Sequence, residues 1–373
     1  MRLVLVSVLL MATAMIPPAA ADTSESDARK VRVQLAVPQT VDADTARLRG
    51  KVTGRDAVVI QRHAFGKDRW IRVKRVSANR HGLFRTTVPK IHRLQRFRAV
   101  AMGRKSITRP VPAASNLTDA CGRRPLKGDG SLWSCTLAEN FSGTELDRSV
   151  WMPQTIFRSG SASAWACYID DPSVLSVHGG ALHLTVRELA EPQPCAGRQN
   201  EPTPYVAGSV STYRLFSQRY GRFEARISNT ATTVPGLQEA FWLWPDDRYN
   251  TAIWPAAGEI DISETYSHRP KLSIPFLHYT QNDNGGPQPG LNTAWDCAAE
   301  RGEYNTYTLE WTATRLKILV NGKTCLVNTS GDRAFRKRYI VALTQMLGTA
   351  DNTYDGEAPL PATMTVDYVK VWQ

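Results

Sequence analysis

Long amphipathic helical patterns are missing from this sequence of 373 residues, and so is any CxxC pair of cysteines. The first absence favours an all-β fold, and the second argues against a zinc site. After residue 21 no segment reaches the roughly 18 apolar residues that a membrane helix needs, so we expect no membrane partner. No nucleic-acid-binding motif occurs either, which argues against a nucleic-acid partner.

The first 21 residues form an apolar leader. Arg2 gives a positive start, residues 3–16 form an apolar run, and two prolines and three alanines follow. This order is typical of a secretory signal peptide with a small-residue cleavage site. A buried N-terminal helix is the alternative. We expect the mature chain to start near Asp22 and to be secreted to the extracellular space.

Cysteine is absent from the first 120 residues, and all six cysteines lie in the C-terminal part. An even number of cysteines in an exported chain predicts three disulfides, although the sequence alone allows several pairings. We favour pairing between sequence neighbours, which gives Cys121–Cys135, Cys167–Cys195 and Cys297–Cys325.

Acidic residues are scarce near the N-terminus. Residues 29–110 contain 22 Lys and Arg but only 4 Asp and Glu, whereas residues 111–373 contain 23 against 27. The excess positive charge therefore belongs to one module. Attraction to a polyanion, such as an acidic cell-wall polymer or polysaccharide, is one interpretation. A solvated basic surface is the second, and nucleic acid is a third that export disfavours.

Residues 31–110 contain short strand-like runs separated by glycine and other breakers. The runs are Val31–Val37, Ala46–Val52, Ala57–His63, Trp70–Val76, Leu83–Val88 and Arg96–Ala101. Regularly spaced short strands predict a small β-sandwich. The pattern resembles immunoglobulin-like accessory modules of exported bacterial enzymes. Residues 111–132, with several Pro and Gly, are predicted to be a linker.

Residues 133–373 again consist of strand patterns and turns. Asn321-Gly322, between Leu316–Val320 and Thr324–Val327, is a strong hairpin signal. A region of this length built from antiparallel strands predicts a large two-sheet sandwich or β-jelly roll.

The segment from Gly258 to Glu264 carries three carboxylates interleaved with two isoleucines. Alternation places Glu259 and Asp261 on one face of a strand, but Glu264 is out of phase with them. One extra residue, a β-bulge at Ile262-Ser263, would return Glu264 to the same face. Clustered acids repel one another, so the arrangement suggests acid–base chemistry. A calcium site or a solvated acidic strand is the alternative.

The surroundings of this strand resemble glycoside hydrolase family 16. The resemblance covers about residues 135–373, and it rests on segments 139–147, 220–226, 240–245, 254–264 and 364–372. It implies a concanavalin A-like jelly roll with an open cleft that cleaves β-linked glucans or galactans with retention of configuration.

The resemblance also implies a role for each acid. Glu259 would be the nucleophile, Glu264 the general acid/base, and Asp261 would hydrogen-bond the nucleophile. The chemistry agrees, because retaining hydrolysis needs two carboxyl groups about 5–5.5 Å apart with separate proton affinities. The two glutamates must therefore lean toward each other over a curved sheet.

Aromatic side chains near the acids are candidates for stacking on sugar rings. We expect Trp254, Trp242 and Trp244 to contribute, with core packing as the alternative for each. His278 is a candidate for the leaving-group side, although a core histidine fits as well. Gln345 is predicted to reach substrate hydroxyls. Glu239 stands where that family more often has Pro or Thr.

The same resemblance suggests a structural calcium, with Glu139 and Asp367 supplying carboxylates. No cofactor is expected for catalysis.

We therefore expect a secreted, monomeric, retaining endo-β-glycanase acting on β-1,3- or mixed β-1,3/1,4-glucan. A galactan-cleaving or transglycosylating member of the same family is one alternative. A non-catalytic glycan-binding jelly roll is another.

Overall fold

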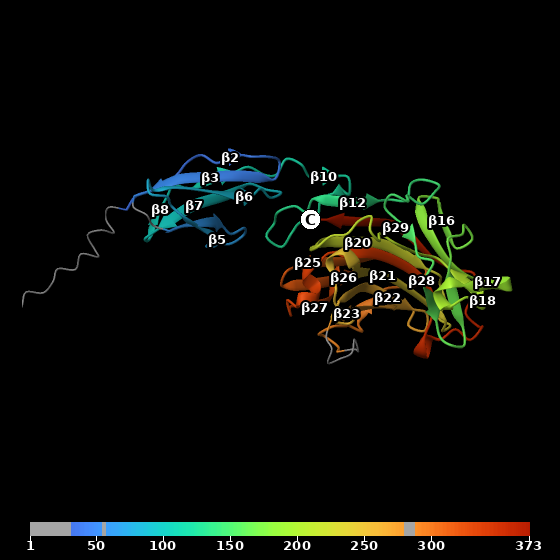
Figure 1. Ribbon diagram of the computed structural model, residues 1–373. Coiled ribbons are helices and arrows are strands. Elements are labelled where there is room, and N and C mark those ends of the chain that lie inside the picture. Colours follow the sequence, from blue (N-terminus) through green and yellow to red (C-terminus); the bar gives the residue numbers. More distant parts are fainter. Residues whose placement is uncertain (1–30, 54–56, 280–287) are drawn as a thin grey trace, which may run out of the picture. The chain divides into compact units, whose positions relative to one another are not determined.

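The computed structural model describes residues 31–53, 57–279 and 288–373, and the predicted signal peptide lies outside these ranges. The chain divides into two compact units (Figure 1). The first contains residues up to Asn116 together with Gly128–Ser131. The second contains Leu117–Lys127 and Leu132–Gln373. The predicted linker 111–132 is thus shared between the units. No helix among the described residues is long and apolar enough to cross a membrane.

The N-terminal unit is built from two small antiparallel sheets. One sheet contains β1 (Val33–Leu35), β2 (Gln39–Thr40), β3 (Thr45–Val52) and β6 (Leu83–Pro89). The other contains β4 (Ala57–His63), β5 (Trp70–Ser77), β7 (Gln95–Ala101), β8 (Arg104–Lys105) and β9 (Arg109–Val111). Alternate residues such as Leu48, Ile60, Phe84 and Phe97 point into one shared core. The unit is therefore a β-sandwich, and its likeness to immunoglobulin modules stays a prediction.

The C-terminal unit is dominated by two large sheets, which Figure 1 shows as stacked layers. The seven-stranded sheet has the order β13-β19-β28-β21-β22-β23-β24. Its strands are β13 (Met152–Pro153), β19 (Ser209–Ser211), β21 (Leu237–Pro245), β22 (Glu259–Tyr266), β23 (Leu272–His278), β24 (Cys297–Ala298) and β28 (Tyr339–Leu347).

The second large sheet has eleven strands. They are β12 (Cys135–Glu139), β14 (Arg158–Gly160), β15 (Trp165–Tyr168), β16 (Leu175–His178), β17 (Ala181–Cys195), β18 (Glu201–Ala207), β20 (Gly221–Asn229), β25 (Asn305–Thr312), β26 (Arg315–Val320), β27 (Lys323–Asn328) and β29 (Ala362–Trp372). A separate small ribbon pairs β10 (Thr118–Asp119) with β11 (Gly122–Arg123). The described residues also form 3-10 helices, namely η1 (Ala196–Arg198), η2 (Asp247–Tyr249), η3 (Arg333–Arg336) and η4 (Ala350–Asn352).

One apolar core lies between the two large sheets. Leu243, Ile260 and Ile262 enter it from the seven-stranded sheet, and Phe223 and Leu309 enter it from the eleven-stranded sheet. Burial of such side chains is the main stabilising contribution in a two-sheet fold. The all-β jelly-roll prediction is therefore confirmed for this unit.

Two local predictions, the cysteine pairing and the hairpin at Asn321-Gly322, are confirmed as well. The disulfides are Cys121–Cys135, Cys167–Cys195 and Cys297–Cys325. Asn321 and Gly322 both have positive φ, 50° and 74°, and they connect β26 to β27. This conformation suits a tight hairpin, and it explains the choice of Asn and Gly at these positions.

Candidate functional site

The acidic strand β22 contains the predicted β-bulge. Against β23, Asp261 pairs with Phe276 and Glu264 pairs with Ile274, so three steps on one strand oppose two on the other. Against β21, Asp261 faces Trp242 and Ser263 faces Phe241, which again leaves one extra residue. The bulge is therefore present on both sides of the strand.

The bulge changes which face the later residues occupy. Ile260 and Ile262 lie in the core, and Ser263 is buried with its hydroxyl 3.0 Å from that of Ser273. The side chains of Ile262 and Ser263 both point away from the cleft. Glu264 therefore lies on the same face of the strand as Glu259 and Asp261. All three acids line one cavity of about 600 Å³.

Each carboxyl group has a defined neighbour. Trp254 Nε1 donates to Glu259 Oε2 at 2.7 Å. His278 Nε2 lies 3.3 Å from Asp261 Oδ2, and ligating atoms of Glu259, Asp261 and His278 lie within 4.8 Å of one another. Gln238 Nε2 donates to Glu264 Oε1 at 2.9 Å. These contacts fix the orientation of the acids before any substrate binds.

The electrostatic environment favours the protonated form of all three acids. Burial, and next the charge of Asp261, raise the pKa of Glu259 to about 8, although His278 and the Trp254 N–H act in the opposite direction. Burial and the Glu264 charge hold the pKa of Asp261 well above its usual range. Burial also raises the pKa of Glu264, against hydrogen bonds from Tyr266 and Gln238. A carboxyl group with a raised pKa can retain a proton near neutral pH and exchange it with a ligand.

The cavity beside the acids has aromatic and apolar walls. Trp242 and Trp244 both line it, with ring centroids 6.0 Å apart, while Leu243 between them lies in the core. Strand alternation accounts for the shared face of the two tryptophans. Ile156 and Phe157 also line the cavity and are 68% and 52% exposed, which leaves an apolar surface open to a ligand.

Trp254 and His278 lie at the edge of the site. Trp254 is 38% exposed, and its ring centroid is 5.3 Å from that of His278. His278 stacks on Phe276 at 4.2 Å, and its Nδ1 is buried without a hydrogen-bond partner. Both side chains are thus close to the acids, as predicted.

Gln345 does not lie in the cleft. Its side chain is fully buried, and it donates to Glu239 Oε1 at 3.2 Å on the core side of β28. The cavity is lined instead by the residues on either side, Thr344 and Met346. The prediction that Gln345 reaches substrate hydroxyls is wrong, because the strand alternates in the opposite phase.

The two residues proposed as calcium ligands have other partners. Arg226 Nη1 lies 2.7 Å from Asp367 Oδ2, and Glu139 Oε1 accepts from the backbone N–H of Phe141 at 2.8 Å. Because a guanidinium already neutralises Asp367, this pair fits a hard cation poorly.

Sequence reasoning missed a buried ion pair next to the site. Arg301 makes two hydrogen bonds to Glu239, at 2.7 and 2.8 Å, and both side chains are at most 3% exposed. Thr265, next to Glu264, donates to Glu239 Oε2 at 2.7 Å. The unusual acid at 239 therefore connects β21 with β22 and with the chain around Arg301. Its signal in the sequence was an acid at a position where the resembling family more often has Pro or Thr.

Comparison with known proteins agrees with this geometry. The model of the Glycosyl hydrolases family 16 matches residues 163–370. Together, the fold and the site define a class of protein. Its members have a two-sheet jelly roll that carries clustered carboxyl groups over an aromatic cleft. The chain belongs to glycosyl hydrolase family 16.

The three relatives described next are each less than 30% identical to this chain. A beta-glucanase of Rhodothermus marinus is 29% identical over 213 residues, covering 53% of this chain and 69% of that protein. Glucan endo-1,3-beta-glucosidase A1 of Niallia circulans is 25% identical over 296 residues, covering 71% of this chain but only 41% of that protein. The catalytic domain of a Thermotoga petrophila laminarinase shares the fold with a TM-score of 0.53 and 18% identity, covering 65% of this chain and 98% of that chain.

Proposed function

We propose that the chain is an exported retaining endo-β-glycanase that hydrolyses β-1,3- or mixed β-1,3/1,4-glucan. The observation that carries this proposal is the bulge in β22, which brings Glu259, Asp261 and Glu264 to one face of an aromatic-lined cleft. Relatives described as a beta-glucanase and a glucan endo-1,3-beta-glucosidase support the substrate class.

The reaction proceeds by double displacement. Glu264 gives its proton to the glycosidic oxygen while the Glu259 carboxylate attacks the anomeric carbon, so the leaving sugar departs with a new hydroxyl. Glu264, now a carboxylate, takes a proton from water, and the resulting nucleophile releases the sugar from Glu259. Configuration is inverted twice and therefore retained.

The neighbours of the acids serve this cycle. The Trp254 N–H stabilises Glu259 as a carboxylate, both before Glu259 attacks the sugar and when the sugar is released from Glu259. Asp261 lies between the two glutamates and contacts His278, so it couples their protonation states. Trp242 and Trp244 offer flat faces on which a sugar ring can stack.

Export is supported by two features. The N-terminal sequence has the order of a signal peptide, and three disulfides are typical of an oxidising compartment. N-terminal sequencing of protein recovered from culture medium tests this proposal. A start near Asp22 supports it, and retention of Met1 contradicts it.

Release of reducing sugar from a polymer panel tests the activity. The panel contains laminarin, mixed-linkage β-glucan and a galactan, and the proteins are the wild type, Glu259→Gln and Glu264→Gln. We expect hydrolysis of one or both glucans by the wild type and a loss of at least about 100-fold in each variant. Cleavage of galactan alone would reassign the substrate. Binding without cleavage would indicate a glycan-binding protein, and longer products would indicate transglycosylation.

A further inference from the structure

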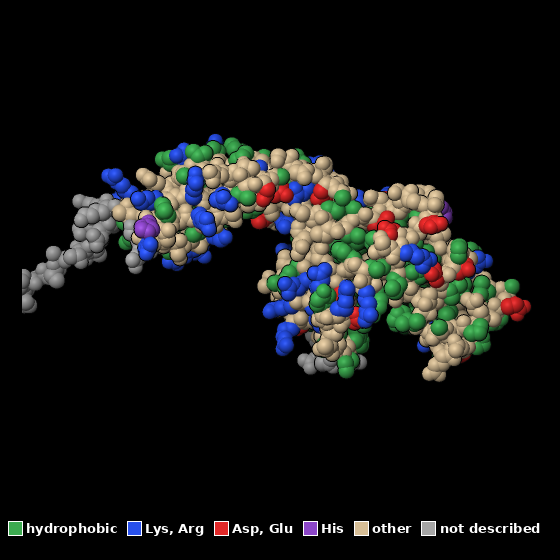
Figure 2. Space-filling view, turned by 45° about the horizontal axis from the view of Figure 1, so that its top comes forward, with side chains coloured by type: hydrophobic (Ala, Val, Ile, Leu, Met, Phe, Trp, Pro, Cys, Tyr) green, Lys and Arg blue, Asp and Glu red, His purple; other side chains and the backbone are tan. Residues whose placement is uncertain are grey.

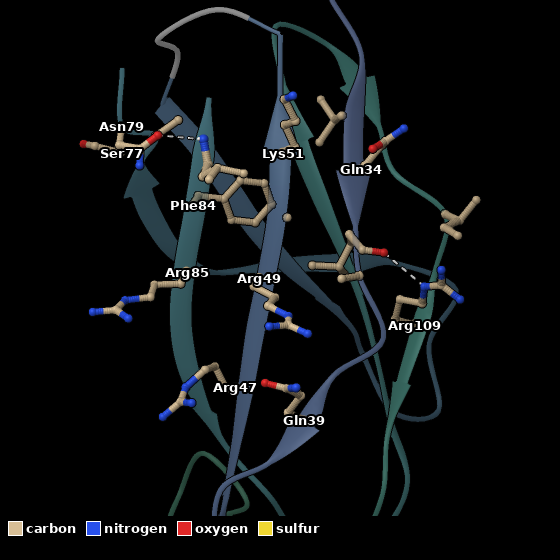
Figure 3. A pocket seen from close by; sticks show the side chains of 17 residues that line it. Gln34, Gln39, Arg47, Arg49, Lys51, Ser77, Asn79, Phe84, Arg85 and Arg109 are labelled. Carbon is tan, nitrogen blue, oxygen red and sulfur yellow. Dashed lines mark hydrogen bonds between the residues drawn. The ribbon is translucent and has the colours of Figure 1, made fainter. Parts of the chain in front are cut away.

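The N-terminal unit carries a broad groove over the outer face of the sheet formed by β1, β3 and β6 (Figure 3). Its volume is about 1320 Å³, roughly twice that of the cavity beside the three acids, so it has room for an extended ligand. Lys and Arg side chains gather on this unit in Figure 2. The groove side chains that carry charge are Arg47, Arg49, Lys51, Arg85 and Arg109.

The cations stand in a row because of strand alternation. Arg47, Arg49 and Lys51 are exposed on β3, while Ala46, Leu48 and Val52 between and beside them lie in the core. Residues two apart on a strand are separated by about 6.6 Å, so this strand offers an evenly spaced line of positive charge.

A second strand adds a cation beside that line. In the pairing of β3 with β6, Arg85 lies directly opposite Arg49. Like charges at directly opposed positions destabilise a sheet. Among the described residues, no carboxylate lines the groove and no ion pair involves these two arginines. An anion bound between the two arginines would offset this cost.

The groove also offers groups that recognise sugars. Gln34 lies opposite Lys51 and Gln39 opposite Arg47, so both amides flank the basic row and can bond hydroxyl or carboxylate oxygens. Arg109 is fixed at the edge by its Nε, which donates to the carbonyl of Leu35 at 3.0 Å.

We propose that this groove binds a linear anionic polysaccharide that carries carboxylate groups. A polymer with an anion on successive sugars can engage several members of the row, and guanidinium groups pair with carboxylates through two hydrogen bonds. The one aromatic among the described lining residues, Phe84, is 3% exposed. No aromatic face is therefore open for the base stacking by which single-stranded nucleic acids are held.

The test measures equilibrium binding of the purified full chain to polygalacturonate, with neutral pullulan and a single-stranded DNA oligonucleotide as comparison ligands. The groove variant combines R47Q, R49Q and R85Q. The matched control combines R72Q, R75Q and R96Q, which remove the same charge from exposed positions on the other sheet. All measurements are made at low and at high ionic strength.

We expect the wild type to bind polygalacturonate but not pullulan, and to lose affinity at high ionic strength. The groove variant should lose at least about tenfold in affinity and the control about twofold or less. Equal losses in both variants would show diffuse charge attraction and overturn the proposal. Equal or tighter binding of DNA would overturn the assignment to polysaccharide.

This proposal is independent of the catalytic one. The groove variant should keep wild-type laminarin hydrolysis, and Glu259→Gln should keep wild-type polygalacturonate binding. A result that contradicts one proposal therefore leaves the other proposal unaffected.

Discussion

The indole Nε1 of Trp254 donates a hydrogen bond of 2.7 Å to Oε2 of Glu259. Two opposing influences thus meet at one carboxyl group, since burial and Asp261 raise its pKa while the indole N–H lowers it. The balance decides at which pH Glu259 is ionised and able to attack a sugar.

Removing the indole N–H should move the acidic limb of activity to higher pH. Trp254→Phe keeps an aromatic ring but loses the donor, so the pKa of Glu259 rises and the carboxylate forms later as pH increases. The measurement is kcat/KM on laminarin as a function of pH. An unchanged limb, with only KM altered, would mean that Trp254 serves sugar stacking alone.

Removing the negative charge of Asp261 should move the acidic limb of activity to lower pH. Asp261→Asn abolishes the charge that raises the pKa of Glu259, so ionisation should occur at lower pH even though maximal activity falls. The two variants form a matched pair with opposite expected shifts. Shifts in the same direction would contradict the electrostatic account.

The raised pKa of Glu259 also predicts a pH-dependent stability difference. The unfolded carboxyl group releases its proton near pH 4.5, but the folded one retains it until about pH 8. Stability that is fully present below pH 4.5 is therefore lost progressively as pH rises toward 8. Glu259→Gln does not titrate and escapes this loss.

Thermal unfolding of Glu259→Gln and the wild type checks this at both ends of the range. The melting temperature of the variant relative to the wild type should rise by at least about 2 °C between pH 4.5 and pH 8. Glu191→Gln, an exposed position, is the control and should show no such trend. If the difference in melting temperature between Glu259→Gln and the wild type does not change with pH, Glu259 is not a buried, protonated acid.

The buried pair Glu239–Arg301 is expected to be structural. Glu239→Gln leaves the guanidinium without its charge partner in the core, which should cost about 3–5 kcal/mol in the free energy of unfolding. Glu310→Gln, in the half-buried pair with Arg222, should cost about 1 kcal/mol or less. Chemical denaturation measures both. Equal losses would show that the pair does not hold the strands around Glu264.

The sequence predicted those features that depend on local rules. The odd step from Asp261 to Glu264 required a bulge, and Asn321-Gly322 suited two successive residues with positive φ. Pairing of cysteines close in sequence was likewise correct.

Features that depend on the phase of a buried strand or on distant pairing were missed. Almost every residue of β28 is buried, so its sequence carries no polar alternation that would show which way Gln345 points. Glu239 and Arg301 are 62 positions apart, and only folding reveals them as partners.

Azide rescue tests the central claim, that Glu259 is the nucleophile and Glu264 the acid/base, most directly. In Glu259→Ala, azide can occupy the vacated space and displace an activated leaving group once, so the product should be an α-glycosyl azide. In Glu264→Ala, azide should intercept the glycosyl intermediate on Glu259 and give a β-glycosyl azide. The anomeric configuration is read by NMR. A β product from Glu259→Ala, or no rescue of either variant, would contradict the account.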